Sequence, residues 1–207
     1  MESLPAEASH PGRKLDPNEV PDAVDLLIRA FERDPFVNWV VRSDRKRHEG
    51  MRRFFTVCLK QLTMPYGEVW VDREFRGIAM WNPPPGLKLS AKEQLHFLGQ
   101  GILGMQLRHT PSRMAGFNEL ERHHPEVPHY YLFFLAVDPD CRGAGIGSRL
   151  LRATLDRCDA EGMPAYLEAT REDLVPFYEH HGYRALPTVT LPYRGPTMYP
   201  MLRSPAA

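Results

Sequence analysis

Tyr130-Tyr-Leu-Phe-Phe-Leu-Ala-Val-Asp-Pro-Asp-Cys-Arg-Gly-Ala-Gly-Ile-Gly147 is the stretch that decides the fold. It begins as an apolar run rich in aromatics, which favours a buried strand. A turn at Asp138-Pro139-Asp140 follows, and then three glycines within five residues precede the leucines of a helix. The order strand, turn, glycine loop, helix leaves backbone N–H groups free at the helix start. Because glycine also permits close approach of the backbone, such a loop suits a bound phosphate.

The composition is that of one globular domain of ordinary polarity. The chain has 207 residues, of which 43% are apolar and 25% are charged, and the 26 basic side chains balance the 26 acidic ones. No net field therefore draws it to nucleic acid or to an anionic membrane. Cys58, Cys141 and Cys158 share no CxxC spacing and fit a reducing compartment, so we expect a cytoplasmic protein without a secretory signal or membrane span. Residues 1–12 are expected to be a flexible tail and 13–204 a single domain.

The N-terminal half is predicted to alternate helices with a strand hairpin. Asp16 and Pro17 start a helix as N-cap and first helical residue, and Pro35 ends it near Asp34. Further expected elements are an edge strand at 13–15, an apolar loop with exposed aromatics at 34–41, a helix at 44–63, hairpin strands at 68–71 and 77–81, and a helical cap inserted at 87–125 that contains a helix from Ser90 to Gly104.

The C-terminal half is predicted to begin with a parallel βαβ unit. The glycine loop leads into a helix from Gly147 to about Glu161, and 165–169 is the next strand, so the crossover should be right-handed. A short helix at 173–181 ends at Gly182. Two antiparallel strands are expected at 183–191 and 197–202.

Two familiar phosphate loops fit the glycines poorly. A Walker loop needs a Lys after its last glycine, and none follows here. A dinucleotide loop is closer, because Gly143-x-Gly145 follows a strand and Glu168 lies where a ribose-binding acid would sit. However, its third glycine would fall at Ser148, and five residues (138–142) separate the strand from Gly143, whereas that turn is tight.

A third pattern fits better. Arg142-Gly-Ala-Gly-Ile-Gly147 matches Arg or Gln, two residues, Gly, one residue, then Gly or Ala, which resembles the pyrophosphate loop of the GNAT acetyltransferase superfamily. Phe177-Tyr-Glu-His-His-Gly-Tyr183 resembles that superfamily's YExxGF signature. Together these motifs cover about residues 130–184. The resemblance implies an α/β (α+β) fold with a central mixed twisted sheet of six to seven strands, flanked by helices, in which two parallel strands splay to hold the cofactor.

The chain also resembles the branch that contains puromycin N-acetyltransferase. The segments that carry this likeness are Ala30-Phe31 with Asp34-Pro35, 68–71 with Trp81, 124–132, Leu167-Glu168 and Pro176-Phe-Tyr178. One departure is visible: relatives often have Asn where this chain has Leu174. The polar contact of that Asn must come from elsewhere, for example from Thr170 or Asp173.

The resemblance implies a binding site for acetyl-CoA as cosubstrate. Its pantetheine arm would pair with the backbone of Leu135, Ala136 and Val137. Its pyrophosphate would receive N–H groups from the loop that comprises Arg142, Gly143, Ala144, Gly145, Ile146, Gly147 and Ser148. Glycines are expected there because a Cβ would obstruct backbone approach.

The resemblance also implies direct transfer of acetyl to a small-molecule amine, with Tyr178 as general acid. The general base stays open between solvent and five side chains: Glu126, His124, His129, Glu168 and Glu121. No metal, nucleic acid or membrane is expected, and the protein would be a monomer or homodimer. The alternatives are a non-catalytic CoA-binding module, a larger acyl donor, or a hydroxyl acceptor. Aromatics at 35–41 suggest a partly apolar acceptor.

Overall fold

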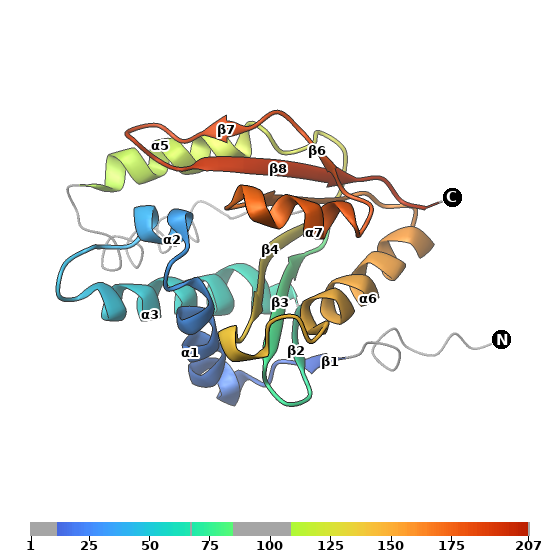
Figure 1. Cartoon of the computed structure of the whole chain (residues 1–207), viewed down its shortest axis with the longest axis horizontal. Coiled ribbons are helices and arrows are strands. Elements are labelled where there is room, and N and C mark those ends of the chain that lie inside the picture. The colour runs from blue at the N-terminus through green and yellow to red at the C-terminus, as the bar shows by residue number, and fades with distance from the viewer. Residues whose placement is uncertain (1–11, 67, 85–108, 207) are drawn as a thin grey trace.

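The computed structural model describes residues 12–66, 68–84 and 109–206 (Figure 1). In these ranges one mixed sheet has the order β1-β2-β3-β4-β5-β8-β6, with β7 paired to β8. The mixed α/β fold predicted from the sequence is therefore confirmed, although these ranges hold eight strands where six to seven were predicted. The strands are β1 Gly12–Lys14, β2 Val69–Asp72, β3 Gly77–Asn82, β4 Tyr130–Val137, β5 Ala165–Ala169, β6 Arg184–Ala185, β7 Val189–Thr190 and β8 Thr197–Arg203; the α-helices are α1 Val20–Phe31, α2 Pro35–Val40, α3 Arg47–Val57, α5 Thr110–Glu121, α6 Ile146–Ala160 and α7 Val175–Glu179.

Helices cover both faces of the sheet. On one face, α1, α2, α3 and Leu120 of α5 share a core with Val71, Met80 and Phe134. On the other face, α6 and Tyr178 of α7 share a second core with Trp81 and other strand residues. In the view of Figure 1, β4 runs between α7 and the first turn of α6. The sheet thus separates two sides of the molecule, here called the α1 face and the α6 face.

The parallel strands β4 and β5 part after two residue pairs. Tyr130 pairs with Ala165 and Tyr131 with Tyr166, and there the pairing ends, although β4 continues to Val137. On its other edge β4 pairs with β3 along its length. Beyond Tyr131, no strand in the described ranges pairs with the β5-side edge of β4. The predicted splay is confirmed.

A β-bulge lies where the strands part. Met80 of β3 pairs with Phe134, but the next residue, Trp81, pairs with Leu132, so Phe133 is an extra residue in β4. An extra residue reverses the inside–outside alternation of a strand. Accordingly Leu132 packs in the core of the α6 face, whereas Phe134 packs in that of the α1 face.

The first helix starts as predicted. The Asp16 side chain accepts from Asn18 N, and Glu19 completes a capping box. The first turn, Pro17–Glu19, is a 3₁₀ turn that leads into α1. This capping satisfies donors that a helix start otherwise leaves without a partner.

The predicted loop at 34–41 is wrong. These residues form α2, in which Pro35 is the first helical residue and the Asp34 side chain accepts from Val37 N at 2.9 Å. Its aromatics are also not exposed, because Phe36 and Trp39 are buried. An apolar run of only eight residues looks like a loop by periodicity, but its Asp-Pro start is a helix signal of the same kind as at Asp16.

Several other helices and strands have different boundaries from those predicted from the sequence. The predicted helix at 44–63 is α3 followed by a π-helical turn, Cys58–Thr63, and the helix at 173–181 is a 3₁₀ turn plus α7. The strand at 183–191 is split into β6 and β7, which pair with β8 in registers one residue apart around Pro187, a residue without an N–H. The helix proposed from Ser90 to Gly104 lies outside the described residues, as does most of the proposed tail.

Candidate active site

The glycine loop is built on a short 3₁₀ turn after β4. The Asp138 carboxylate accepts from Asp140 N and from the guanidinium of Arg29 on α1, at 2.7 Å for Nη2. The chain then passes through Gly143 and Gly145 with φ of +80° and +71°. Side chains rarely adopt this left-handed conformation, so glycine is required at both positions for the chain to turn into α6.

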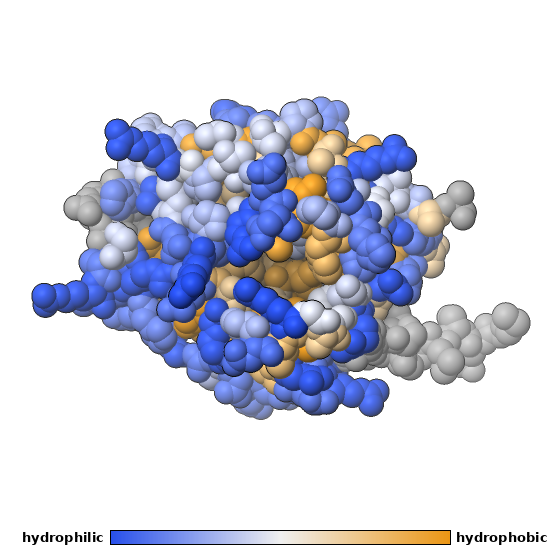
Figure 2. Space-filling view, in the orientation of Figure 1, coloured by the Kyte–Doolittle hydropathy of each residue, from blue (hydrophilic) through white to orange (hydrophobic). Residues whose placement is uncertain are grey.

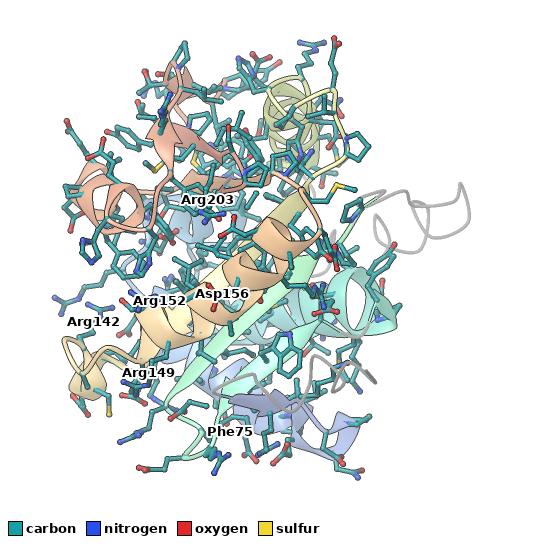
Figure 3. The ribbon with its side chains drawn as sticks, turned by 90° about the vertical axis from the view of Figure 1, so that its right-hand side faces the viewer. Phe75, Arg142, Arg149, Arg152, Asp156 and Arg203 are labelled. Carbon is teal, nitrogen blue, oxygen red and sulfur yellow. The ribbon has the colours of Figure 1, made fainter. Side chains whose placement is uncertain are left out.

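The N-terminus of α6 is arranged to receive an anion. This 15-residue helix has no side-chain cap on its first turn, so the N–H groups of Ile146, Gly147 and Ser148 have no capping acceptor. Figure 3 shows Arg142 in the loop and Arg149 and Arg152 on the exposed side of α6, near its start. The helix dipole and these guanidinium groups both favour negative charge here.

The glycines serve different purposes. A Cβ at Gly143 would meet no atom within 4 Å, and one at Gly145 would lie 3.3 Å from Nη1 of Arg149. A Cβ at Gly147 would touch Val137 at 3.4 Å and Phe177 at 3.7 Å. These distances are ordinary van der Waals contacts, so neither the backbone conformation nor crowding by protein atoms requires glycine at 147.

The end of β4 connects this loop to the gap between the strands. Leu135 and Val137 pack towards the core of the α6 face, and Ala136 packs towards the other core. Figure 2 shows an apolar hollow in the surface at the place where Figure 1 shows β4 between α7 and the start of α6. The unpaired edge of β4 thus ends where the glycine loop begins, and that loop leads directly into the start of α6.

Tyr178 lies on α7, and the neighbouring Phe177 lies next to Val137 and the start of α6. Tyr178 is buried, and its ring packs edge-on against Phe177 and Tyr183, with centroid distances of 5.0 and 5.9 Å. Burial raises the pKa of Tyr178 well above its ordinary value, and the nearby charge of Asp34 adds to this. The phenol therefore stays protonated at neutral pH.

Asp34 was not recognised from the sequence as a site residue. Its carboxylate is buried and receives hydrogen bonds from Val37 N and from the hydroxyl of Thr170, just after β5. Burial raises the pKa of Asp34, although both hydrogen bonds oppose this. Thr170, one of the two residues suggested to replace the missing Asn, thus joins α2 to the end of β5. Leu174 instead packs against the core of the α6 face.

Three of the five base candidates lie together. His124 Nε2 is 3.2 Å from Glu168 Oε1, Tyr131 donates to Glu168 Oε2 at 2.8 Å, and the rings of His124 and His129 are 5.5 Å apart. Burial lowers the pKa of His124, but the hydrogen bond and charge of Glu168 outweigh it, so the pKa is raised. Burial lowers the pKa of His129.

The other two candidates stand apart. Glu121 is exposed at the end of α5 and acts on the histidines only through its charge. Glu126 is exposed in the loop before β4. Within the described ranges no three His, Cys, Asp or Glu side chains gather as metal ligands do. In the same ranges no helix combines the length and apolarity that a bilayer crossing needs.

The comparison with protein families agrees with this geometry. The model of the acetyltransferase (GNAT) family matches residues 79–183, about half of the chain, from β3 through the glycine loop to the end of α7. The chain belongs to this family. The parted strands and the uncapped start of α6 of this GNAT protein both lie within the matched residues.

Individual relatives are distant. A protein of Schizosaccharomyces pombe described as an uncharacterized N-acetyltransferase is 22% identical over 188 residues, which cover 83% of this chain and 73% of that protein. A Corynebacterium glutamicum structure described as histone acetyltransferase HPA2 and related acetyltransferase has a TM-score of 0.65 at 24% identity, covering 94% and 95% of the two chains. A Drosophila melanogaster polyamine N-acetyltransferase has a TM-score of 0.59 at 15% identity, covering 93% and 98%. These structures show a shared fold.

Proposed function

We propose that this GNAT protein transfers an acetyl group from acetyl-CoA directly to the amine of a small molecule. One observation carries the proposal: the unpaired edge of β4 leads to an uncapped helix start, and α7, which carries Tyr178, lies against that helix start. A ligand with a pyrophosphate and a slender amide-bearing arm fits a site of this form. Membership of the acetyltransferase family supports acetyl as the group transferred.

The backbone would hold the cosubstrate. The backbone groups of Leu135, Ala136 and Val137 would pair with the amides of the pantetheine arm, as an added strand would. The N–H groups from Arg142 through Ser148 would bind the pyrophosphate, as proposed from the sequence. Arg142 is exposed, so its guanidinium can add charge without the cost of burial.

A side chain would supply the proton that the leaving group needs during acetyl transfer. Acetyl-CoA supplies an activated thioester, and the neutral amine attacks its carbonyl carbon. A C–N bond forms, the C–S bond breaks, the thiolate leaves, and the nitrogen releases one proton to solvent as the amide forms. Tyr178 would donate its phenolic proton to that thiolate and recover a proton from solvent. Such general acid catalysis typically contributes about 10²–10⁴-fold.

The acceptor would enter from the α1 face. We propose that α2 and α5, the described part of the cap predicted at 87–125, form its walls within a single domain spanning 13–204. Phe36, Trp39 and Phe117 pack together between α2 and α5, which favours a partly apolar acceptor.

The test combines binding with turnover. Calorimetry should show acetyl-CoA binding, and a thiol-release assay over a panel of primary amines should show turnover for at least one of them. Mass spectrometry of the product would place the acetyl group on nitrogen. Binding without release of thiol on any amine or alcohol would instead favour a CoA-binding module, and absence of binding would contradict the proposal.

A further inference from the structure

Four side chains on the α1 face form what we call the Glu168 cluster: His124, Tyr131, Tyr166 and Glu168. The Glu168 side chain is only 3% exposed and that of His124 is 18% exposed. The His124 ring lies 4.7 Å from each of the Tyr131 and Tyr166 rings. The cluster joins the loop after α5 to β4 and β5.

The strand alternation places this cluster opposite α6. Ala165, Leu167 and Ala169 of β5 pack in the core of the α6 face. Tyr166 and Glu168 alternate with them and therefore project from the α1 face. A ligand that reaches the gap from the start of α6 would meet the Glu168 cluster on the far side of the sheet.

The cluster also lies where the strands part. Tyr131 and Tyr166 are the last paired residues of β4 and β5, and the bond from Tyr131 to Glu168 crosses the start of the gap. Two residues beyond Glu168, Thr170 binds Asp34, whose charge acts on Tyr178. Glu168 therefore adjoins the gap between the parted strands, and Asp34 links the end of β5 to the surroundings of Tyr178.

The cluster has hydrogen-bonding capacity to spare. Glu168 Oε1 and the Tyr166 hydroxyl are both buried, and neither makes a hydrogen bond of good geometry: the close neighbours of Oε1 are the imidazole of His124 and the Tyr166 side chain itself. Unpartnered buried polar atoms are uncommon because each one costs free energy. A primary ammonium, which has three donors and a positive charge, would match both oxygens.

We propose that Glu168 accepts a proton from the ammonium of the acceptor and passes it to His124. This inference rests on the proposed function, of which it supplies the missing base. The ammonium loses one proton to Glu168 Oε1, and that proton moves to His124 Nε2, which leaves a carboxylate and an imidazolium. The freed amine lone pair then attacks the thioester. Tyr131 is a positioning residue that fixes the other carboxylate oxygen.

The protonation state of His124 gives the proposal a pH signature. The groups that face His124 are Glu121, His129, Tyr131, Tyr166 and Glu168. Two carboxylates favour its imidazolium and burial opposes it, with a raised pKa as the outcome. Only the neutral imidazole can take up the proton, so turnover should fall as the pH drops through this raised value.

The first test measures kcat/KM against pH for the acceptor found in the amine panel. Glu168→Gln and His124→Gln should each lower kcat/KM by about 10²–10⁴-fold and remove the acid limb governed by His124. The matched controls are His123→Gln, on the neighbouring exposed imidazole, and Glu126→Gln, which should keep the wild-type profile. Unchanged profiles in Glu168→Gln and His124→Gln, with acetyl-CoA affinity retained, would overturn the proposal.

A second test needs no turnover and so separates this inference from the proposed function. Calorimetry would measure benzylamine and benzyl alcohol binding to the protein saturated with CoA. Glu168→Gln should weaken benzylamine at least about tenfold and leave benzyl alcohol unchanged, because only the amine carries charge. Equal effects on both probes, or no benzylamine binding by the wild type, would overturn the proposal even if other amines are acetylated.

Discussion

Tyr178 has surroundings that hold its proton. The aromatic rings of Phe177 and Tyr183 exclude water, and the buried Asp34 carboxylate opposes a second negative charge nearby. Both effects stabilise the neutral phenol. The ordinary pKa of a leaving thiol, about 8.5, lies below that of an ordinary phenol at about 10, and burial raises the pKa of Tyr178 further. Proton transfer to the thiolate is therefore unfavourable by acidity alone and depends on the phenol being held close to the sulfur.

Replacing Tyr178 by Phe should separate binding from chemistry. Tyr178→Phe keeps the packing and removes the proton, so acetyl-CoA affinity should persist while kcat falls by about 10²–10⁴-fold. Stopped assays and calorimetry would measure the two quantities. Tyr193→Phe is the control, because Tyr193 is 70% exposed. A wild-type kcat in Tyr178→Phe would remove this residue from the acid role.

Asp34 should make stability depend on pH. Its folded pKa is raised, so between the unfolded value of about 3.9 and that raised value the native state binds more protons than the unfolded state. Stability attributable to Asp34 is then lost as the pH rises through this window. Asp34→Asn keeps an oxygen to cap α2 but does not titrate.

Urea unfolding at about pH 4 and about pH 7 would measure the effect. The free energy of unfolding of Asp34→Asn should gain on that of the wild type as the pH rises. Asp34→Ala, which also removes the cap of α2, should be less stable than Asp34→Asn by about 0.5–2 kcal/mol at either pH. A difference between Asn and wild type that does not change with pH would contradict the raised pKa.

At the scale of elements, α6 has a left-handed glycine just before its first residue and another just after its last turn. Gly145 has φ of +71° and Gly162 has φ of +64°. Only the first lies at the proposed pyrophosphate site. A Cβ at Gly162 would meet no atom within 4 Å, so a side chain there would be strained only by the backbone conformation. Gly145 and Gly162 share this conformation but lie at opposite ends of α6.

Substituting valine at each position therefore distinguishes damage to the proposed binding loop from the general effect of backbone strain. Gly145→Val and Gly162→Val should both destabilise the protein, by roughly 1–3 kcal/mol. Only Gly145→Val should reduce acetyl-CoA affinity, by at least about tenfold, because it alters the N–H groups at the helix start. Thermal unfolding and calorimetry would report the two effects. Equal affinities in both variants would place the cofactor elsewhere.

The same elements show how far sequence reasoning reaches. The apolar β4, the glycine loop and α6 were predictable because local patterns specify them within a few residues. The lengths of β6 and β7 were not predictable, because the break between these two strands depends on how each pairs with β8 on either side of Pro187. The Asp34–Thr170 bond joins residues 136 positions apart, so no local pattern could reveal it.

The Glu168 cluster was predictable only in part. His124, His129 and Glu168 were all named as base candidates, yet the sequence ranked them no higher than Glu121 or Glu126. What brings them together is the pairing of Tyr131 with Tyr166, and that register follows from a parallel crossover and not from either strand alone. The bulge at Phe133 determines which β4 side chains point to the α1 face, where we propose that the acceptor enters. It contains no Gly or Pro from which it could have been predicted.

At the scale of the molecule, the sheet consists of two parts joined by a short parallel contact. Strands β1 to β4 form one part, and β5 to β8 form the other. The buried Asp34–Thr170 bond and the bidentate pair from Arg203 of β8 to Asp159 of α6, at 2.6 Å for each bond, also link regions on either side of the gap.

Cosubstrate binding should be visible along the open edge of β4. Hydrogen exchange of the amides of residues 132–137 should slow when acetyl-CoA is added, because the pantetheine arm would pair with that edge. ADP, which has a pyrophosphate but no such arm, should slow exchange in the glycine loop only. The β2 amides, already paired on both sides, serve as the internal reference. Protection that avoids β4 would contradict the proposed path.

The parting of β4 and β5 also affects how easily another chain can pair with the open edge of β4. An edge with unpaired backbone groups attracts other chains, and proteins usually protect such edges at the rim of a sheet with charge, proline or short strands. Here the open edge is internal, with β5 on one side and α6 and α7 nearby. A neighbouring strand and two helices stand between this edge and a passing chain, so it does not need the charge, proline or short strand that protects an outer edge. The parting of β4 from β5 thus leaves backbone groups unpaired without placing them at the rim of the sheet.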